Sequence, residues 1–254
     1  MVVIDFNKFG IEVGDGNQVQ KISTMKTHPL CPAYVNHNSL TFEVVDDKNR
    51  VTNKVFNFIK EIGRGTYGRA HLMTTPQGKQ CVAKFVKVDN EESRAACVQE
   101  AAMHIIVYEL SKNVAQGPFS PKVFQVGAIN GSDEEEVVIV FDCLTNTLNT
   151  LYLANPKYAP IIIPNTVKQV AHHLLWLQKH LDYNHRDLKT DNIMYKDSNT
   201  NPLNPQVYLI DFGFSCLHFN GVRLHGTKYF SGSCNKPTRD LGPVSYTHLR
   251  AHET

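Results

Sequence analysis

Apolar runs of strand length, separated by polar turns, mark the first half of the chain as a series of strands. Residues 39–59 predict a β-hairpin around a polar turn at 46–49, and residues 69–74 and 81–88 predict two more strands around a turn at 76–78. The apolar runs at 123–127 and 137–141 also have strand length. Residues 1–38 keep no period, so we expect an extension that packs loosely on the domain or is partly disordered.

Two longer segments have the apolar spacing of helices. Residues 90–113 begin at Asn90, a good N-cap, and two glutamates follow it where they suit the positive end of a helix. Residues 164–180 begin at Pro164 and place their apolar side chains on one face. Strands with one helix come first and helices follow, which predicts a two-lobed α+β fold with a β-rich first lobe.

Charge and cysteine content narrow the function classes. The 26 basic and 24 acidic residues leave a net charge of +2, which offers no electrostatic basis for binding nucleic acid or an anionic membrane. The six cysteines form no C-x-x-C pair, so we expect reduced thiols and a cytoplasmic protein. Residues 1–10 carry charges within their apolar stretch, unlike a signal peptide. No apolar run approaches the ~20 residues that cross a bilayer.

A glycine-rich motif follows the predicted hairpin. Gly63, Gly65 and Gly68 form a G-x-G-x-x-G pattern, in which the missing Cβ atoms let the backbone approach phosphate oxygens. Such a motif opens a helix in a Rossmann turn but joins two strands in a kinase loop. Because residues 69–74 continue as a strand, the pattern favours the second interpretation.

A lysine and a glutamate follow at regular distances. Lys84 lies sixteen positions after Gly68 on the next strand, where it can reach phosphates held beneath the loop. Such a lysine needs an anionic partner, and Glu100 in the following helix is our choice because apolar positions flank it. Glu92 and Glu109 are the alternatives.

The strongest signal is a pair of motifs in the second half of the chain. Residues 185–192 read His-Arg-Asp-Leu-Lys-Thr-Asp-Asn, and an Asp-Phe-Gly triplet follows at residues 211–213. Taken in order with the earlier motifs, residues 55–241 resemble the protein kinase family, in the form of a divergent Ser/Thr kinase such as those of large DNA viruses. The resemblance implies transfer of the γ-phosphate of ATP to Ser or Thr hydroxyls of protein substrates.

The resemblance also implies roles for individual residues. Asp187 would orient the substrate hydroxyl and accept its proton, and Lys189 would lie near the γ-phosphate. Asn192 and Asp211 would bind Mg²⁺. Lys84, oriented by Glu100, would hold the α- and β-phosphates.

An adenine pocket and the phosphate loop complete the implied nucleotide site. The loop glycines would cover the phosphates, and the side chains of Val82 and Phe141 would line the adenine slot. The main chain of Asp142 and Leu144 would contact the adenine ring.

The end of the chain departs from the family pattern. No Ala-Pro-Glu triplet occurs, and residues 239–241 resemble the start of a central helix that Gly242 and Pro243 then break. We expect an extension at 1–38, a first lobe at 39–142, a truncated second lobe at 143–241 and a non-native tail at 242–254. Without the remaining helices, Leu174 and Leu177 are expected to be partly exposed. Candidate phosphorylation positions after the Asp-Phe-Gly triplet are Ser215, Thr227, Tyr229, Ser231 and Ser233.

Two other functions stay open. A kinase-like fold could bind nucleotide as a scaffold, or as an inactive fragment, although every implied catalytic position is filled. A related fold could phosphorylate small molecules, but the full His-Arg-Asp and Asp-Phe-Gly motifs favour protein substrates. We expect the intact protein to be monomeric.

Overall fold

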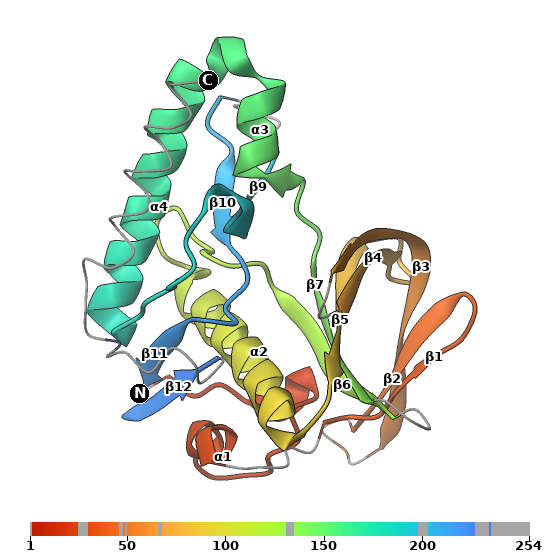
Figure 1. Ribbon diagram of the computed structural model, residues 1–254. Coiled ribbons are helices and arrows are strands. Elements are labelled where there is room, and N and C mark those ends of the chain that lie inside the picture. Colours follow the sequence, from red (N-terminus) through yellow and green to blue (C-terminus); the bar gives the residue numbers. More distant parts are fainter. Residues whose placement is uncertain are drawn as a thin grey trace. The chain divides into compact units, whose positions relative to one another are not determined.

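The computed structural model describes residues 2–24, 30–45, 48, 50–65, 68–130, 135–197, 203–226 and 234 (Figure 1). The chain divides into two compact units. The first comprises Met1–Ala102 and Lys122–Cys143, and the second comprises Met103–Pro121 and Leu144–Thr254. Strands dominate the first unit and the long helix α4 (Ala159–Leu181) belongs to the second, which bears out the predicted α+β class.

A seven-stranded antiparallel sheet forms the body of the first unit, in the order β1-β2-β3-β4-β5-β7-β6. All five predicted strand regions are present, most of them longer than predicted. The strands are β1 (Ala33–Val35), β2 (Ser39–Val45), β3 (Val51–Gly65), β4 (Gly68–Thr74), β5 (Gln80–Val88), β6 (Val123–Asn130) and β7 (Glu135–Asp142). Adjacent strands of the sheet are also consecutive in sequence, with one exception. Strand β7 lies between β5 and β6, so β5 pairs with β7 and not with β6.

The sheet curls until its two edges meet. Pro32, just before β1, forms a parallel bridge with Ala128 of β6, and the Ala128 amide donates to the Cys31 carbonyl at 3.0 Å. The enclosed side chains include Phe42, Phe85 and other fully buried apolar residues. Pairing the edges in this way protects backbone groups that would otherwise template association with another chain.

The N-terminal segment packs more tightly than predicted. It contains the 3₁₀ turn η1 (Phe6–Phe9) and the helix α1 (Gln18–Thr24). Phe6, Ile11 and Ile22 have no exposed surface. The expectation of a loose extension is therefore wrong for these described residues, because their apolar side chains supply core that the sequence period did not reveal.

Gly10 provides a direct test of this packing. Its backbone has a φ of +87°, and an added Cβ would overlap Val126 O and Gln125 Nε2 and lie 2.7 Å from Cys31 Sγ. We expect Gly10→Ala to lower the free energy of unfolding by about 2–5 kcal/mol, from backbone strain and overpacking together. Gly16 has a φ of +95° with nothing within 4 Å of the added Cβ, so Gly16→Ala isolates the backbone cost. Urea unfolding of both variants gives the comparison, and equal losses would contradict the packing account.

The helix α2 (Glu91–Ser111) matches the first predicted helix. Its start is capped reciprocally, since the Ser93 amide donates to Asn90 Oδ1 at 2.9 Å and the Asn90 amide donates to Ser93 Oγ at 3.2 Å. Residues up to Ala102 belong to the first unit, and those from Met103 belong to the second.

The second unit is built around α4 (Ala159–Leu181), which starts five residues before the predicted Pro164. Leu174 and Leu177 are buried, so the predicted exposure is wrong: α4 packs against α3, β10 and β11. The other elements are α3 (Leu148–Ala154), η2 (Pro156–Tyr158), η3 (Thr190–Asn192), β8 (Asn146–Thr147), β9 (Ile193–Lys196), β10 (Gln206–Leu209), β11 (Cys216–Phe219) and β12 (Val222–His225).

A disulfide joins Cys216 to Cys234 in this unit. The expectation of six reduced thiols is therefore wrong for this pair. Cys31, Cys81, Cys97 and Cys143 are free. The sequence concealed the pair because it lies 18 positions apart and meets only through tertiary structure.

Several predicted features lie outside the described residues. These are the non-native tail at 242–254, the helix start at 239–241, and the candidate phosphorylation positions Thr227, Tyr229, Ser231 and Ser233. Ser215 is described and fully buried, with its hydroxyl donating to the His185 carbonyl at 3.1 Å, so it is not presented to another kinase in this structure. Among the described residues, no helix is long and apolar enough to cross a membrane.

His173 on α4 makes the fold sensitive to acid. Its ring stacks on Phe119 at 4.1 Å, and Nε2 donates to the Gln116 carbonyl at 3.3 Å. Burial lowers the pKa of His173 to about 3. The hydrogen bond to Gln116 opposes this shift, and neighbouring His172 adds to it.

A specific pH dependence follows. The unfolded chain takes up a proton near the ordinary pKa of 6.5 while the folded chain does not, so stability is full above pH 6.5 and falls as the pH drops toward 3. The loss approaches about 1.4 kcal/mol per pH unit. His173→Gln is expected to flatten this slope, whereas His180→Gln, at an exposed site, should keep it. Urea unfolding between pH 7 and 4.5 measures the slopes, and identical slopes for the His173 variant and wild type would contradict the assignment.

Candidate active site

The glycine motif forms the turn between β3 and β4. Gly65 pairs with Gly68 across it, and the two residues between them lie outside the described part of the chain. A Cβ on Gly68 would overlap the Phe85 carbonyl, so this position requires glycine for packing. A Cβ on Gly63 or Gly65 would meet nothing within 4 Å, which leaves open space beside the backbone there.

Lys84 and Glu100 are brought together inside the first unit. Lys84 lies on β5 between Ala70 of β4 and Ile139 of β7. Its Nζ lies 2.8 Å from Glu100 Oε1, and the glutamate side chain is 9% exposed. The alternative Glu109 instead contacts Lys112 at 2.5 Å.

The electrostatic effect of this pair reaches a neighbouring thiol. Burial, followed by the negative charge of Glu100, raises the pKa of Cys97 to about 12, while Lys84 opposes the shift. Cys97 is therefore a neutral packing residue on the same helix.

The residues expected around adenine come from two places. Val82 of β5 lies directly opposite Phe141 of β7, and both side chains are half-buried. The Asp142 amide donates to the Lys122 carbonyl at 2.8 Å, and its carboxylate lies 3.0 Å from Lys79 Nζ. Leu144 is buried in the second unit.

The candidate catalytic residues converge on Asp187 within the second unit. Lys189 Nζ lies 2.8 Å from Asp187 Oδ2. Asn192 Nδ2 donates to both the carbonyl and Oδ2 of Asp187, each at 2.8 Å. The hydrogen bond to Asp187 raises the pKa of Lys189, desolvation opposes this shift, and the charges of Asp187, Asp211 and Asp191 add to it. Lys189 is therefore cationic throughout the neutral range.

Two hydrogen bonds fix Ile210, which links β10 to Asp211. The Ile210 amide donates to the Asn192 carbonyl at 3.0 Å, and His185 Nε2 donates to the Ile210 carbonyl at 3.0 Å. Asp211 and Arg186 have φ values of +60° and +68°. Each such conformation costs of order 1–3 kcal/mol for a residue with a side chain, and such strain clusters at functional sites.

No sequence pattern predicted the aromatic packing around Phe212, the residue that follows Asp211. Phe212 is fully buried and stacks on His104 of α2 with ring centroids 4.0 Å apart. The rings of Tyr183 and His185 contact its edges. The one sequence signal for a role of His104 near the site is its position a helical turn after Glu100, on the same face of α2.

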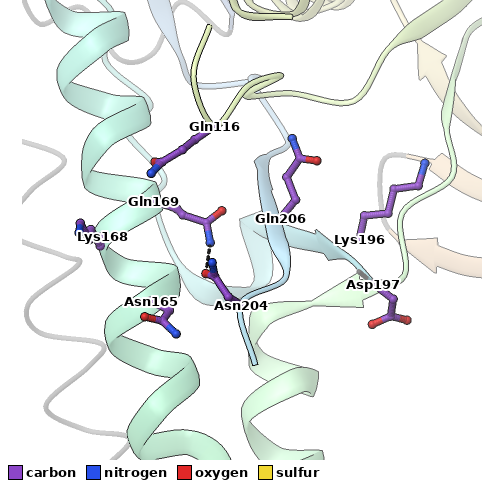
Figure 2. Close-up of a pocket in the computed structure, with 8 residues that line it drawn as sticks. All are labelled: Gln116, Asn165, Lys168, Gln169, Lys196, Asp197, Asn204 and Gln206. Atoms are coloured by element: carbon purple, nitrogen blue, oxygen red, sulfur yellow. Dashed lines mark hydrogen bonds between the residues drawn. The ribbon is translucent and has the colours of Figure 1, made fainter. Parts of the chain in front are cut away.

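A separate polar pocket of about 460 Å³ lies elsewhere in the second unit (Figure 2). It is lined by Gln116, Asn165, Lys168, Gln169, Lys196, Asp197, Asn204 and Gln206. Gln169 Nε2 donates to Asn204 Oδ1 at 2.9 Å and to the Pro205 carbonyl at 3.0 Å, so this side chain ties α4 to the segment before β10. No predicted site residue lines it, and the carboxamides of Asn165, Gln169 and Gln206 act as structural links.

Comparison with known proteins agrees with these features. Residues 56–233, more than half of the chain, match the protein kinase domain family. The probable cell cycle serine/threonine-protein kinase CDC5 homolog of Encephalitozoon cuniculi (strain GB-M1) is 26% identical over 164 residues. That alignment covers 65% of this chain and 32% of the relative, so the chain spans about a third of the length of this curated relative. The chain belongs to the protein kinase family.

Proposed function

We propose that the protein transfers the γ-phosphate of ATP to Ser or Thr hydroxyls of protein substrates. The convergence of Lys189 and Asn192 on Asp187 is the observation that carries this proposal. It supplies a carboxylate for the substrate hydroxyl, a cation beside it, and an amide that holds the carboxylate in one orientation. Phosphoryl transfer depends mainly on such positioning and on neutralising oxygen charge.

Asp187 acts on the acceptor. Its carboxylate orients the substrate hydroxyl and takes up the proton as the hydroxyl oxygen attacks. Lys189 neutralises charge on the γ-phosphate, and its raised pKa keeps it protonated for this role. The Ser/Thr preference rests on this lysine, which the resemblance associates with Ser/Thr kinases, and it agrees with the printed name of the relative.

Asn192 and Asp211 fit a Mg²⁺ site by their chemistry. Asn192 Nδ2 donates both of these side-chain hydrogen bonds, so the amide oxygen is the atom that can bind a hard cation. When bound, Mg²⁺ would neutralise phosphate charge. The hydrogen bond between the Asn192 carbonyl and the Ile210 amide holds the backbone next to Asp211 against Asn192.

Residues of the first unit make most of the nucleotide contacts in this proposal. The Gly63–Gly68 turn covers the phosphates, and Lys84 holds the α- and β-phosphates with its direction set by Glu100. Val82 and Phe141 line the adenine slot. An adenine contact at Asp142 would use its carbonyl, because its amide already donates to Lys122; the Leu144 main chain would add a second contact.

The wider setting of the activity is also part of the proposal. We place a monomeric enzyme in the cytoplasm, acting on proteins rather than on nucleic acid or membranes. The balanced net charge of +2 and the four free cysteines support this setting.

A phosphorylation assay tests the proposal. The purified chain is incubated with γ-labelled ATP, Mg²⁺ and a mixture of acidic and basic proteins, and labelled products are hydrolysed for phosphoamino acid analysis. We expect phosphoserine or phosphothreonine that disappears when Mg²⁺ is chelated. Label found only in small molecules, or nucleotide binding without transfer, would contradict protein kinase activity.

A further inference from the structure

The disulfide lies beside the catalytic loop, which comprises residues 185–192 and carries Asp187. Its Cα atoms are 5.9 Å apart, within the range that a disulfide requires. Cys216 and Cys234 are both buried, at 0% and 1% exposure. Cys216 is the first residue of β11 and lies five positions after Asp211.

Asn184 connects both halves of the disulfide to the catalytic loop. Its backbone amide donates to the Cys216 carbonyl and its carbonyl accepts from the Cys216 amide, each at 2.9 Å. Its side-chain Nδ2 donates to the carbonyl of Cys234. Asn184 directly precedes His185 and lies three residues before Asp187. One residue therefore holds Cys216 and Cys234 and leads straight into the loop that carries the candidate catalytic base.

Further hydrogen bonds extend this connection. Ser215, the neighbour of Cys216, donates to the His185 carbonyl at 3.1 Å, and the Gly226 amide donates to the Ser215 carbonyl at 3.0 Å. His185 in turn donates to the Ile210 carbonyl next to Asp211. The disulfide, the β11–β12 hairpin and the catalytic loop thus share one hydrogen-bond network.

The remaining buried cysteines are poor competitors for oxidation. Burial raises the pKa of Cys31 to about 11 and that of Cys81 and Cys97 to about 12. A thiol attacks a disulfide as its thiolate, so these groups react slowly at neutral pH. None of the three is joined to another cysteine.

We propose that Cys216 and Cys234 form a reversible redox link that, when oxidised, holds the chain at Cys234 against Asn184 and raises kinase activity. This inference rests on the proposed function for its activity readout. Reduction removes the covalent tie and leaves the Asn184–Cys234 hydrogen bond to hold Cys234 against Asn184. The loop at Asp187 then loses part of its support.

Oxidation requires a low-molecular-weight disulfide such as oxidised glutathione. One cysteine loses its proton and its thiolate attacks a glutathione sulfur, which breaks the glutathione disulfide, forms a mixed disulfide and releases one glutathione thiolate. The second cysteine thiolate attacks the protein sulfur of that mixed disulfide and releases the second glutathione. Two electrons pass from the protein thiols to glutathione, and the released thiolates take up the two protons. Because both sulfurs are buried, exchange in either direction needs local opening.

The first measurement asks whether the link forms and reverses. The full chain is equilibrated at graded ratios of reduced to oxidised glutathione, its free thiols are alkylated, and the Cys216–Cys234 peptide pair is quantified by mass spectrometry. We expect a reversible transition in this pair while Cys31 stays alkylatable after denaturation at every ratio. Absence of the linked pair at every ratio would overturn the proposal.

The second measurement is independent of catalysis. Hydrogen exchange of peptides that contain Asn184 and Cys216 is compared in the oxidised and reduced wild type. We expect these amides to exchange about tenfold faster after reduction. Equal exchange in both states would overturn the proposal even if the disulfide forms.

Matched variants connect the link to activity. Wild type and Cys31→Ser, which keeps a hydrogen-bonding side chain at an unlinked cysteine, should both lose several-fold in phosphorylation rate on reduction. The double variant Cys216→Ser/Cys234→Ser should show the same rate in both buffers; if it does not fold, the oxidised and reduced wild type still give the comparison. An unchanged wild-type rate would overturn the regulatory part. Absence of phosphorylation in both states, with exchange still responding to reduction, would refute the proposed function and leave the link itself supported.

Discussion

Asp187→Asn is expected to reduce phosphorylation by about 10²–10⁴-fold while leaving the fold and nucleotide binding intact. The substitution removes the carboxylate that accepts the proton but keeps the size and shape of the side chain. Its amide oxygen can still accept from Asn192 Nδ2, which donates to Asp187 Oδ2 at 2.8 Å. Lys189 loses its anionic partner, but its side chain is 47% exposed, so the loss of stability should be small.

Asp191 offers a matched control for this variant. It lies in η3, between Thr190 and Asn192, and its side chain is exposed. Asp191→Asn removes the same charge from the same loop and should retain most of the activity. Initial rates with a protein substrate, nucleotide binding by fluorescence and thermal unfolding separate the effects. If the Asp187→Asn variant keeps a phosphorylation rate within tenfold of wild type, Asp187 does not have the proposed role.

Lys84→Met is expected to give the second largest effect, a loss of about 10²–10³-fold in phosphorylation rate. The variant removes the cation proposed to hold the phosphates. It also leaves Glu100, whose side chain is 9% exposed, without the lysine that lies 2.8 Å away. Removing one partner of a buried ion pair is costly, but Lys84 is about one third exposed, which lessens the cost. We therefore expect a stability loss of roughly 1–3 kcal/mol.

A double variant separates the two effects of Lys84→Met. Lys84→Met/Glu100→Gln removes the uncompensated charge and should recover much of the stability without recovering activity. Lys87→Met, at an exposed position on the same strand, should change neither quantity by much. Rates and urea unfolding of the three variants give the answer. Activity that returns along with stability in the double variant would show that Lys84 serves only the fold.

Local patterns were sufficient for most of the elements. The strand-forming segments of β4, β5 and β7 and the capped start of α2 depend on neighbours a few residues away, and each appears where the sequence predicted it. Pro164 predicts a helix start at its own position, but α4 begins at Ala159 and accommodates this proline internally. The roles of the site residues stay predictions, although the structure brings Lys84 to Glu100 and Asn192 to Asp187.

The sequence by itself determined the family, the strand and helix order of the motifs, and the residue types available for phosphoryl transfer. These follow from spacing along the chain. Tertiary structure alone decided the closure of the sheet by residues before β1, the stacking of His104 on Phe212, and the Cys216–Cys234 disulfide. Each joins positions whose separation carries no periodic signal, because such contacts depend on how strands and helices pack rather than on the local preferences of either partner.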